Sequence, residues 1–193
     1  MTNSLLTSSQ TVGPFFHDCL LRPDAVRTVL AGAATEGQRI RVVGRVYDGD
    51  GAGVPDAMIE CWQANHYGRY NHPADTRDLP LDPAFSGFGR TGSDAEGAFS
   101  FETIKPGRVP FDGEQLQAPH ICLTVLARGL LNHLSTRLYF AGDPANAEDP
   151  ILLRVPPERR ATLLAKPTHI DGITVYRLDI VLQGEGETVF FNL

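Results

Sequence analysis

Alternation of apolar and polar residues with a period of two dominates the chain from residue 38 onward. The clearest run spans residues 173–183. One face of that run carries Thr174, Tyr176, Leu178, Ile180 and Leu182, and the other carries Arg177, Asp179 and Gln183. Such alternation is typical of strands half buried against one core.

Five similar runs are Arg39–Tyr47, Ala57–Gln63, Ala98–Ile104, His120–Ala127 and Ser135–Phe140. Turn-forming stretches such as DGDGAG, DAEG, KPG and AGDP separate them. Six or seven short strands with these separators predict an all-β fold, and a β-sandwich in particular.

Helices are expected to be few. Pro23–Leu30 and Pro157–Ala165 are predicted as two short helices, because each begins with a proline in the first turn, where a missing N–H costs nothing. More than thirty residues between Gln63 and Ala98 show no clear periodicity and predict a long loop between early strands. Loops of that length are usually functional or wrap a partner. We expect a single domain over residues 1–193, with residues 1–36 forming an N-terminal arm and helix that contacts a partner.

Composition excludes several classes of partner. The net charge is −6 and the pI is about 5.4, so no basic surface is available for nucleic acid or for an anionic membrane. No apolar run approaches the ~18 residues that a membrane helix needs. Three cysteines without CxxC spacing argue against a disulfide framework and favour a reducing cytoplasm.

Residues 42–70 read VVGRVYDGDGAGVPDAMIECWQANHYGRY, and three later stretches follow in a fixed order: FGRTGSDAEGAFSFETIKPG, APHICLTVLARG and TRLYFAGDP. Together they resemble the intradiol ring-cleavage dioxygenases, and the resemblance covers roughly residues 8–193. It implies a transthyretin-like β-sandwich. It also implies a mononuclear Fe(III) held by two tyrosines and two histidines, and O2-dependent cleavage between the two hydroxyl-bearing carbons of a catechol.

The family's ligand motifs are only half preserved. The tyrosine of GRY is present as Tyr70, and the first histidine of the HIH strand is present as His120. The tyrosine of KPGxYP is replaced by Val109, and the second histidine by Cys122. A valine has no donor atom, and a thiolate is a soft, oxidisable ligand for a ferric ion. The resemblance therefore implies a vestigial site that holds no metal, with the catalytic set incomplete in this chain.

The resemblance also implies what an iron-free chain is for. SSQTVGPFF at 8–16, LARG at 126–129 and QGEGETVFF at 183–191 are similar to the alpha chains of two-chain family members that act on protocatechuate. Such members imply a homologous beta chain that binds Fe(III), a small aromatic substrate with O2, and a higher-order alpha-beta oligomer. Alpha-chain positions that line the substrate pocket match Thr11, Pro14, Phe15 and Arg128 here. A guanidinium suits a substrate that carries a carboxylate.

Other interpretations stay open from the residues alone. His66, Tyr67, Tyr70 and His72 could form a metal site of their own, although a solvated loop is the commoner outcome. Phe190–Phe191, near the chain end, would be exposed unless a subunit covered them. The chain could be a purely structural or regulatory subunit. It could also be a homomeric dioxygenase with Cys122 or His72 as a replacement ligand.

Overall fold

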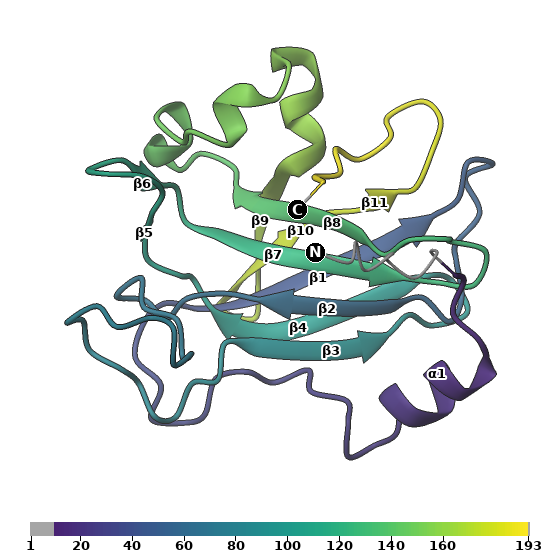
Figure 1. The fold of residues 1–193 in the computed structure, drawn as a ribbon, viewed down its shortest axis with the longest axis horizontal. Coiled ribbons are helices and arrows are strands. Elements are labelled where there is room, and N and C mark those ends of the chain that lie inside the picture. Colours follow the sequence, from purple (N-terminus) through teal and green to yellow (C-terminus); the bar gives the residue numbers. More distant parts are fainter. Residues whose placement is uncertain (1–9, 193) are drawn as a thin grey trace, which may run out of the picture.

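The computed structural model describes residues 10–192, so the first nine residues of the expected N-terminal arm lie outside the described part (Figure 1). The strands are β1 (Arg39–Tyr47), β2 (Met58–Trp62), β3 (Phe88–Gly92), β4 (Ala98–Ile104), β5 (Val109–Pro110), β6 (Leu116–Gln117), β7 (His120–Leu126), β8 (Leu134–Phe140), β9 (Leu164–Ile170), β10 (Ile173–Arg177) and β11 (Ile180–Val181). The helices are α1 (Pro14–Leu20) and the 3-10 helices η1 (Pro144–Ala147), η2 (Leu152–Arg154) and η3 (Pro157–Leu163). The protein is mostly β, as predicted.

The strands pair in the order β11-β1-β10-β9-β8-β7-β2-β3, with β4 paired to β1. A short parallel pairing of β8 with β9 links the β1–β4–β10–β9 half to the β8–β7–β2–β3 half. In Figure 1 the two halves lie in separate layers, and the sheet is nearly closed. The β5–β6 hairpin lies outside this sheet.

Alternating burial explains why the predicted strands form. In β1, Ile40, Val42 and Val46 are buried in the core, while alternate residues are half buried or exposed. Partners from the other half, such as Ile121 and Leu123 of β7, belong to the same apolar cluster. All five strands predicted beside 173–183 are present within a residue of their expected bounds.

Gly44, in β1, allows the backbone of Leu178 to approach the strand closely. A Cβ at this position would lie 2.0 Å from the carbonyl oxygen of Leu178. Leu178 donates its N–H to the carbonyl of Val43 at 3.0 Å, just where the predicted strand 173–183 is interrupted. The run is therefore two strands, β10 and β11, and Asp179 between them accepts the N–H of Arg45 at 3.0 Å.

The helix predicted at Pro23–Leu30 is wrong. This segment begins with a turn and then forms isolated bridges to two strands, Arg27 with Arg90 and Val29 with Glu102. Its backbone bonds across to Arg90 and Glu102 at 2.7–2.9 Å satisfy donors that a helix would have used, and tertiary pairing overrides a weak local signal. The helix of the N-terminal arm is α1 instead, with Pro14 as its first residue.

Two further expectations need correction. The helix predicted at Pro157–Ala165 exists as a 3-10 helix that ends at Leu163, because Leu164 and Ala165 begin β9 and pair with Tyr139 and Phe140. The predicted loop between Gln63 and Ala98 contains β3. Glycines at both its second and last positions removed the alternation that would have revealed β3.

The chain itself covers the aromatic pair at its end. Phe190 packs against the main core cluster, and Phe191 against a second cluster that includes Tyr139 and Leu163. The Phe191 N–H donates to the Ser135 carbonyl at 2.8 Å. Both side chains are thus half buried by this chain, and a subunit contact over their exposed parts stays a prediction.

Candidate functional site

Strand β7, which carries the predicted ligand positions His120 and Cys122, presents its polar side chains on the outer face of the sheet. Cys122 lies between Trp62 of β2 and Arg137 of β8 in the strand register. His120 is paired with Tyr139 of β8, and their ring centroids are 5.7 Å apart. Cross-strand partners point to the same face. Trp62, Cys122 and Arg137 therefore form one row, with His120 and Tyr139 in the neighbouring row.

Two of the ligand positions predicted from the motifs meet in an open pocket above this face. Tyr70, from the loop after β2, stacks on Trp62 with centroids 5.6 Å apart and ring planes 12° apart. Val109, in β5, is buried and lines the same pocket, as does Gln117 of β6. The pocket has a volume of about 750 Å³. The predicted positions Tyr70 and Val109 are thus brought together, with Cys122 beside Trp62 on the strand below.

Burial keeps all three remaining donors in their neutral forms. It raises the pKa of Tyr70 to about 12 and also raises the pKa of the Cys122 thiol. It lowers the pKa of His120 to about 4, and the Arg137 charge adds to this effect. The Nδ1 of His120 donates to the carbonyl of Ala118 at 2.8 Å, so its protonated nitrogen faces the backbone.

These residues do not fit a ferric ion. Val109 offers no donor where the motif places a phenolate, and Cys122 is a protonated thiol. The permanent charge of Arg137 acts on both Cys122 and Tyr70 and would repel a trivalent cation. Across residues 10–192, no cluster of three or more histidine, cysteine or acidic side chains is arranged to hold a metal.

The histidines and tyrosines of the loop after β2 separate into two groups. His66 and Tyr67 lie together, with ring centroids 3.7 Å apart, and Tyr67 donates to Glu36 at 2.6 Å. Tyr70 and His72 instead contact Trp62. The four side chains therefore do not converge on one point and do not form the metal site that the sequence left open.

The predicted substrate-pocket residues gather elsewhere, around the turn after β7. The Gly129 N–H donates to the Thr11 hydroxyl at 2.9 Å, which fixes the N-terminal arm to this turn. Arg128 pairs with Asp56 at 3.1 Å, yet 73% of its side chain is exposed. Pro14 and Phe15 follow Thr11 as the first residues of α1, and Phe15 is 82% exposed.

The two groups of residues lie at opposite ends of one strand. His120 begins β7 and Arg128 follows its last residue, Leu126. A seven-residue strand spans about 20 Å. Arg128 is therefore too far away to act on a ligand held in the pocket of Tyr70 and Val109.

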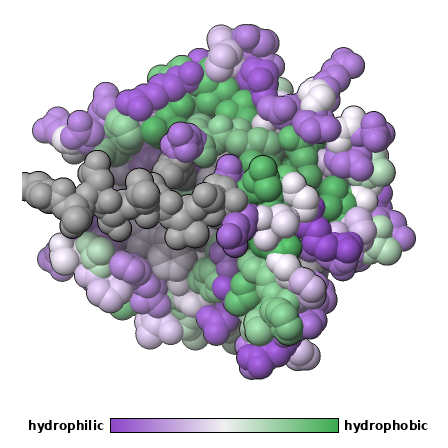
Figure 2. Space-filling model, turned by 45° about the vertical axis from the view of Figure 1, so that its right-hand side comes forward, coloured by the Kyte–Doolittle hydropathy of each residue, from purple (hydrophilic) through white to green (hydrophobic). Residues whose placement is uncertain are grey.

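Exposed apolar side chains accompany the Arg128 end. Leu131, in the turn after β7, is 65% exposed, and Phe15 is the most exposed large apolar residue among those described. Figure 2 brings the α1 end of the molecule forward and shows apolar patches between polar ones on this side. Isolated exposed apolar residues are ordinary, but large contiguous patches mark contact surfaces.

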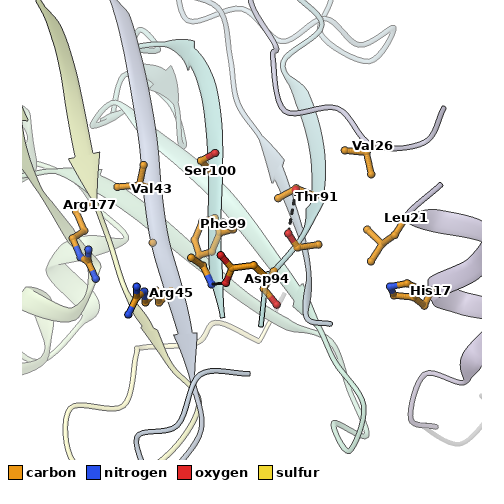
Figure 3. Close-up of a pocket in the computed structure, with 14 residues that line it drawn as sticks. His17, Leu21, Val26, Val43, Arg45, Thr91, Asp94, Phe99, Ser100 and Arg177 are labelled. Atoms are coloured by element: carbon orange, nitrogen blue, oxygen red, sulfur yellow. Dashed lines mark hydrogen bonds between the residues drawn. The ribbon is translucent and has the colours of Figure 1, made fainter. Parts of the chain in front are cut away.

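A second open pocket, of about 650 Å³, lies between α1 and the sheet. In Figure 3, His17 and Leu21 face it from the helix side, while Phe99 of β4 and Asp94 of the β3–β4 turn face it from the sheet. Arg45 and Arg177 lie at its far side. None of the residues predicted for the site lines this pocket.

Sequence reasoning missed Arg137 and Gln117. The alternation in TRLYF already places Arg137 on the face opposite the buried Leu138. Its position beside Cys122 depends on strand register, which the sequence does not show.

Comparison with known proteins defines the class. The family model described as "Dioxygenase" matches residues 12–184. The dioxygenase domain of a dioxygenase and carbohydrate-binding fusion from Streptomyces sp. SirexAA-E has a TM-score of 0.64 and 27% identity, covering 92% of this chain and 98% of that one. The chain belongs to the intradiol dioxygenase family.

Within the family, three curated relatives match over at least 93% of this chain. The protocatechuate 3,4-dioxygenase alpha chain of Burkholderia cepacia is 45% identical over 205 aligned positions, with 100% of both chains covered. The Pseudomonas putida alpha chain is 42% identical, with 96% of each covered. The Burkholderia cepacia beta chain is 39% identical, with 93% of this chain and 77% of that chain covered.

Proposed function

We propose that this chain is the iron-free alpha-type subunit of a protocatechuate 3,4-dioxygenase. A homologous beta chain binds the Fe(III), and the assembled enzyme cleaves protocatechuate with O2 to 3-carboxy-cis,cis-muconate. The chain alone is inactive in this proposal. We also assign its mostly-β fold to the transthyretin-like sandwiches.

One observation carries the proposal: the chain lacks two of the four metal donors, but its Arg128 side chain is exposed at the surface. Val109 and Cys122 remove two of the four ligands, whereas Thr11 fixes the arm beside Arg128 through Gly129. Because Arg128 lies about 20 Å along β7 from the remnant site, it serves a pocket in another chain.

The chemistry of Arg128 suits the substrate. Protocatechuate carries a ring carboxylate, and a guanidinium offers a fixed fork of donors that stays charged at every physiological pH. The single exposed ion pair with Asp56 contributes little in solution and is readily exchanged for a substrate carboxylate. Thr11, Pro14 and Phe15 form the neighbouring wall in this proposal, and Phe15 supplies an apolar surface for the ring.

The partner is proposed to be a beta chain, because relatives carry separate alpha and beta names. The N-terminal arm and its helix α1, which buries none of its own residues in this chain, form the proposed contact. A higher-order alpha-beta oligomer in a reducing cytoplasm is part of the proposal. Its three cysteines, all in the described part, are free, which suits such a compartment.

The test is an Arg128→Ala variant, co-expressed with an iron-binding beta chain. Loss of a charged hydrogen bond costs about 1.5–3 kcal/mol, so kcat/KM for protocatechuate should fall roughly 10- to 100-fold. The value for catechol, which has no carboxylate, should change less than about twofold. Arg177→Ala is the matched control, because Arg177 is also exposed and pairs with an aspartate, Asp179, but lies in β10 outside the N-terminal arm.

Two outcomes would contradict the proposal. Unchanged kcat/KM for protocatechuate in Arg128→Ala would remove the assigned role and leave a structural subunit. An isolated chain that binds stoichiometric Fe(III) and opens catechol rings would point instead to a homomeric enzyme.

A further inference from the structure

Arg137 lies in the same cross-strand row as Trp62 and Cys122, beside the remnant site formed by the predicted ligand positions, and its side chain has few hydrogen-bond partners. Its Nη1 donates to the Gln117 side-chain oxygen at 2.7 Å and lies 3.4 Å from the Tyr139 hydroxyl. Its guanidinium carbon is 5.8 Å from the centroid of the Phe191 ring. Among the described residues, no carboxylate lies within salt-bridge distance of Arg137, and its buried Nε has no hydrogen-bond partner. Buried polar groups are nearly always paired, so this donor indicates a missing acceptor.

The other charges near the site are already matched. Arg77 is paired with Asp75 through Nε and Oδ1 at 2.7 Å. Asp149 is fully buried and accepts from the Ala118, Ile151 and Leu152 backbone at 2.6–2.9 Å. It also accepts from the Tyr139 hydroxyl at 3.1 Å, and His120 is neutral. Arg137 is therefore the cation of this face that has no carboxylate in direct contact; the charge of buried Asp149 acts on it across the Tyr139 hydroxyl that bridges them.

The adjoining pocket suits a flat ring. Trp62 and Tyr70 form a nearly parallel aromatic pair along it, and Val109 and Pro110 add apolar surface. Its volume of about 750 Å³ leaves room for a single-ring ligand together with water. Gln117 lines the pocket and also accepts from Arg137, which links the ring-sized space to a guanidinium that contacts no carboxylate.

We infer that the remnant site is a non-catalytic binding pocket for small aromatic carboxylates, with Arg137 as the carboxylate anchor. The ring lies against Trp62 and Tyr70, and the carboxylate receives the free N–H groups of Arg137. A fork of donors and a carboxylate are matched in both geometry and charge. The inference concerns a different pocket from that served by Arg128 and stands independently of the proposed function.

The full-length chain carries its own reporter, because Trp62 is its single tryptophan. Titration with benzoate should change Trp62 emission in a saturable manner, with one site per chain by equilibrium dialysis. Benzamide, the neutral isostere, should bind at least tenfold more weakly. Cyclohexanecarboxylate should bind several-fold more weakly because it lacks the flat ring. Protocatechuate and muconate then show whether the ring acid or the ring-opened acid is preferred.

Arg137→Gln should weaken benzoate binding at least tenfold, and Arg137→Lys should retain part of it. Arg41→Gln, on a solvent-exposed ion pair with Glu102, is the matched control and should bind as the unsubstituted chain does. Circular dichroism of each variant checks that the fold is kept. In the complex with a beta chain, Arg137→Gln should remove one benzoate-binding site per alpha chain, as measured by equilibrium dialysis.

The inference is overturned by three results. These are no saturable site in the unsubstituted chain, equal affinity for benzoate and benzamide, or full affinity in a folded Arg137→Gln variant. The proposed function is tested separately, by the activity of the Arg128→Ala variant toward protocatechuate. A negative result in the benzoate binding test would therefore not contradict it.

Discussion

Arg137 is tied to Gln117 by a 2.7 Å hydrogen bond that joins strand β8 to the β5–β6 hairpin. The bond holds a guanidinium beside Cys122, its partner in the register of β7 and β8. Two features of the proposed iron-free subunit oppose iron binding: the missing donors at Val109 and Cys122, and the positive charge of Arg137.

Restoring donors alone should therefore be insufficient to restore iron binding. We expect Val109→Tyr with Cys122→His to bind Fe(III) weakly, and the same pair with Arg137→Gln to bind it at least tenfold more tightly, because the triple variant removes the repelling charge. Iron content and the visible absorption of ferric tyrosinate measure the difference. Equal loading of the double and triple variants would show that Arg137 has no electrostatic part in excluding iron.

Stability should depend on pH through His120. Its pKa is about 4 in the folded chain against 6.5 for an ordinary histidine, so the unfolded chain binds the proton more readily between these values. The free energy of unfolding should fall by about 2 kcal/mol as pH drops from 7 to 4.5. Urea unfolding at several pH values measures this loss. A His120→Gln variant that showed the same dependence would assign it to other groups.

The hydrogen bond from Gly129 to Thr11 should hold the arm in place without supporting the whole fold. Thr11→Val removes an exposed acceptor, at a cost of about 0.5–1.5 kcal/mol at most. We expect faster limited proteolysis near residues 10–13 and a lower kcat/KM for protocatechuate in the complex. Thr11→Ser keeps the hydroxyl and should restore both. If Thr11→Val were cleaved no faster than the unsubstituted chain, this bond would not anchor the arm.

Phe15 should matter for assembly and not for folding. Its side chain is 82% exposed, so Phe15→Ser should change the free energy of unfolding by less than about 0.5 kcal/mol. The affinity for a beta chain, measured by analytical ultracentrifugation, should fall at least fivefold. Leu153→Ser is the matched control, because Leu153 is 47% exposed but lies in η2, away from the arm. Equal losses in both variants would argue against a contact through Phe15.

Much of the fold follows from the sequence, because alternation reports which strand face is buried. The run Arg39–Tyr47 predicted β1 with its bounds, and Ala98–Ile104 did the same for β4. The helix predicted at Pro23–Leu30 from its local sequence does not form. Its backbone instead makes hydrogen bonds to Arg90 and Glu102, which are distant in the sequence. A strand as short and glycine-rich as β3 left no pattern to find.

The site was predictable only as far as its motifs extended. Tyr70, Val109, His120 and Cys122 could be located from their motifs, and Arg128 from its resemblance to related chains. The pairing of Arg137 with Cys122 and with Gln117 needs the register of β7, β8 and the β5–β6 hairpin. Register depends on the packed sheet as a whole, so no local pattern could reveal it.

Because β7 is about 20 Å long, substitutions at its two ends should have independent effects. Substitutions more than about 10 Å apart usually have additive effects. A duplicated copy could thus shed its own metal ligands at the His120 end through successive neutral steps. Under the proposed function, the Arg128 end would remain under selection throughout, because the partner subunit would depend on it.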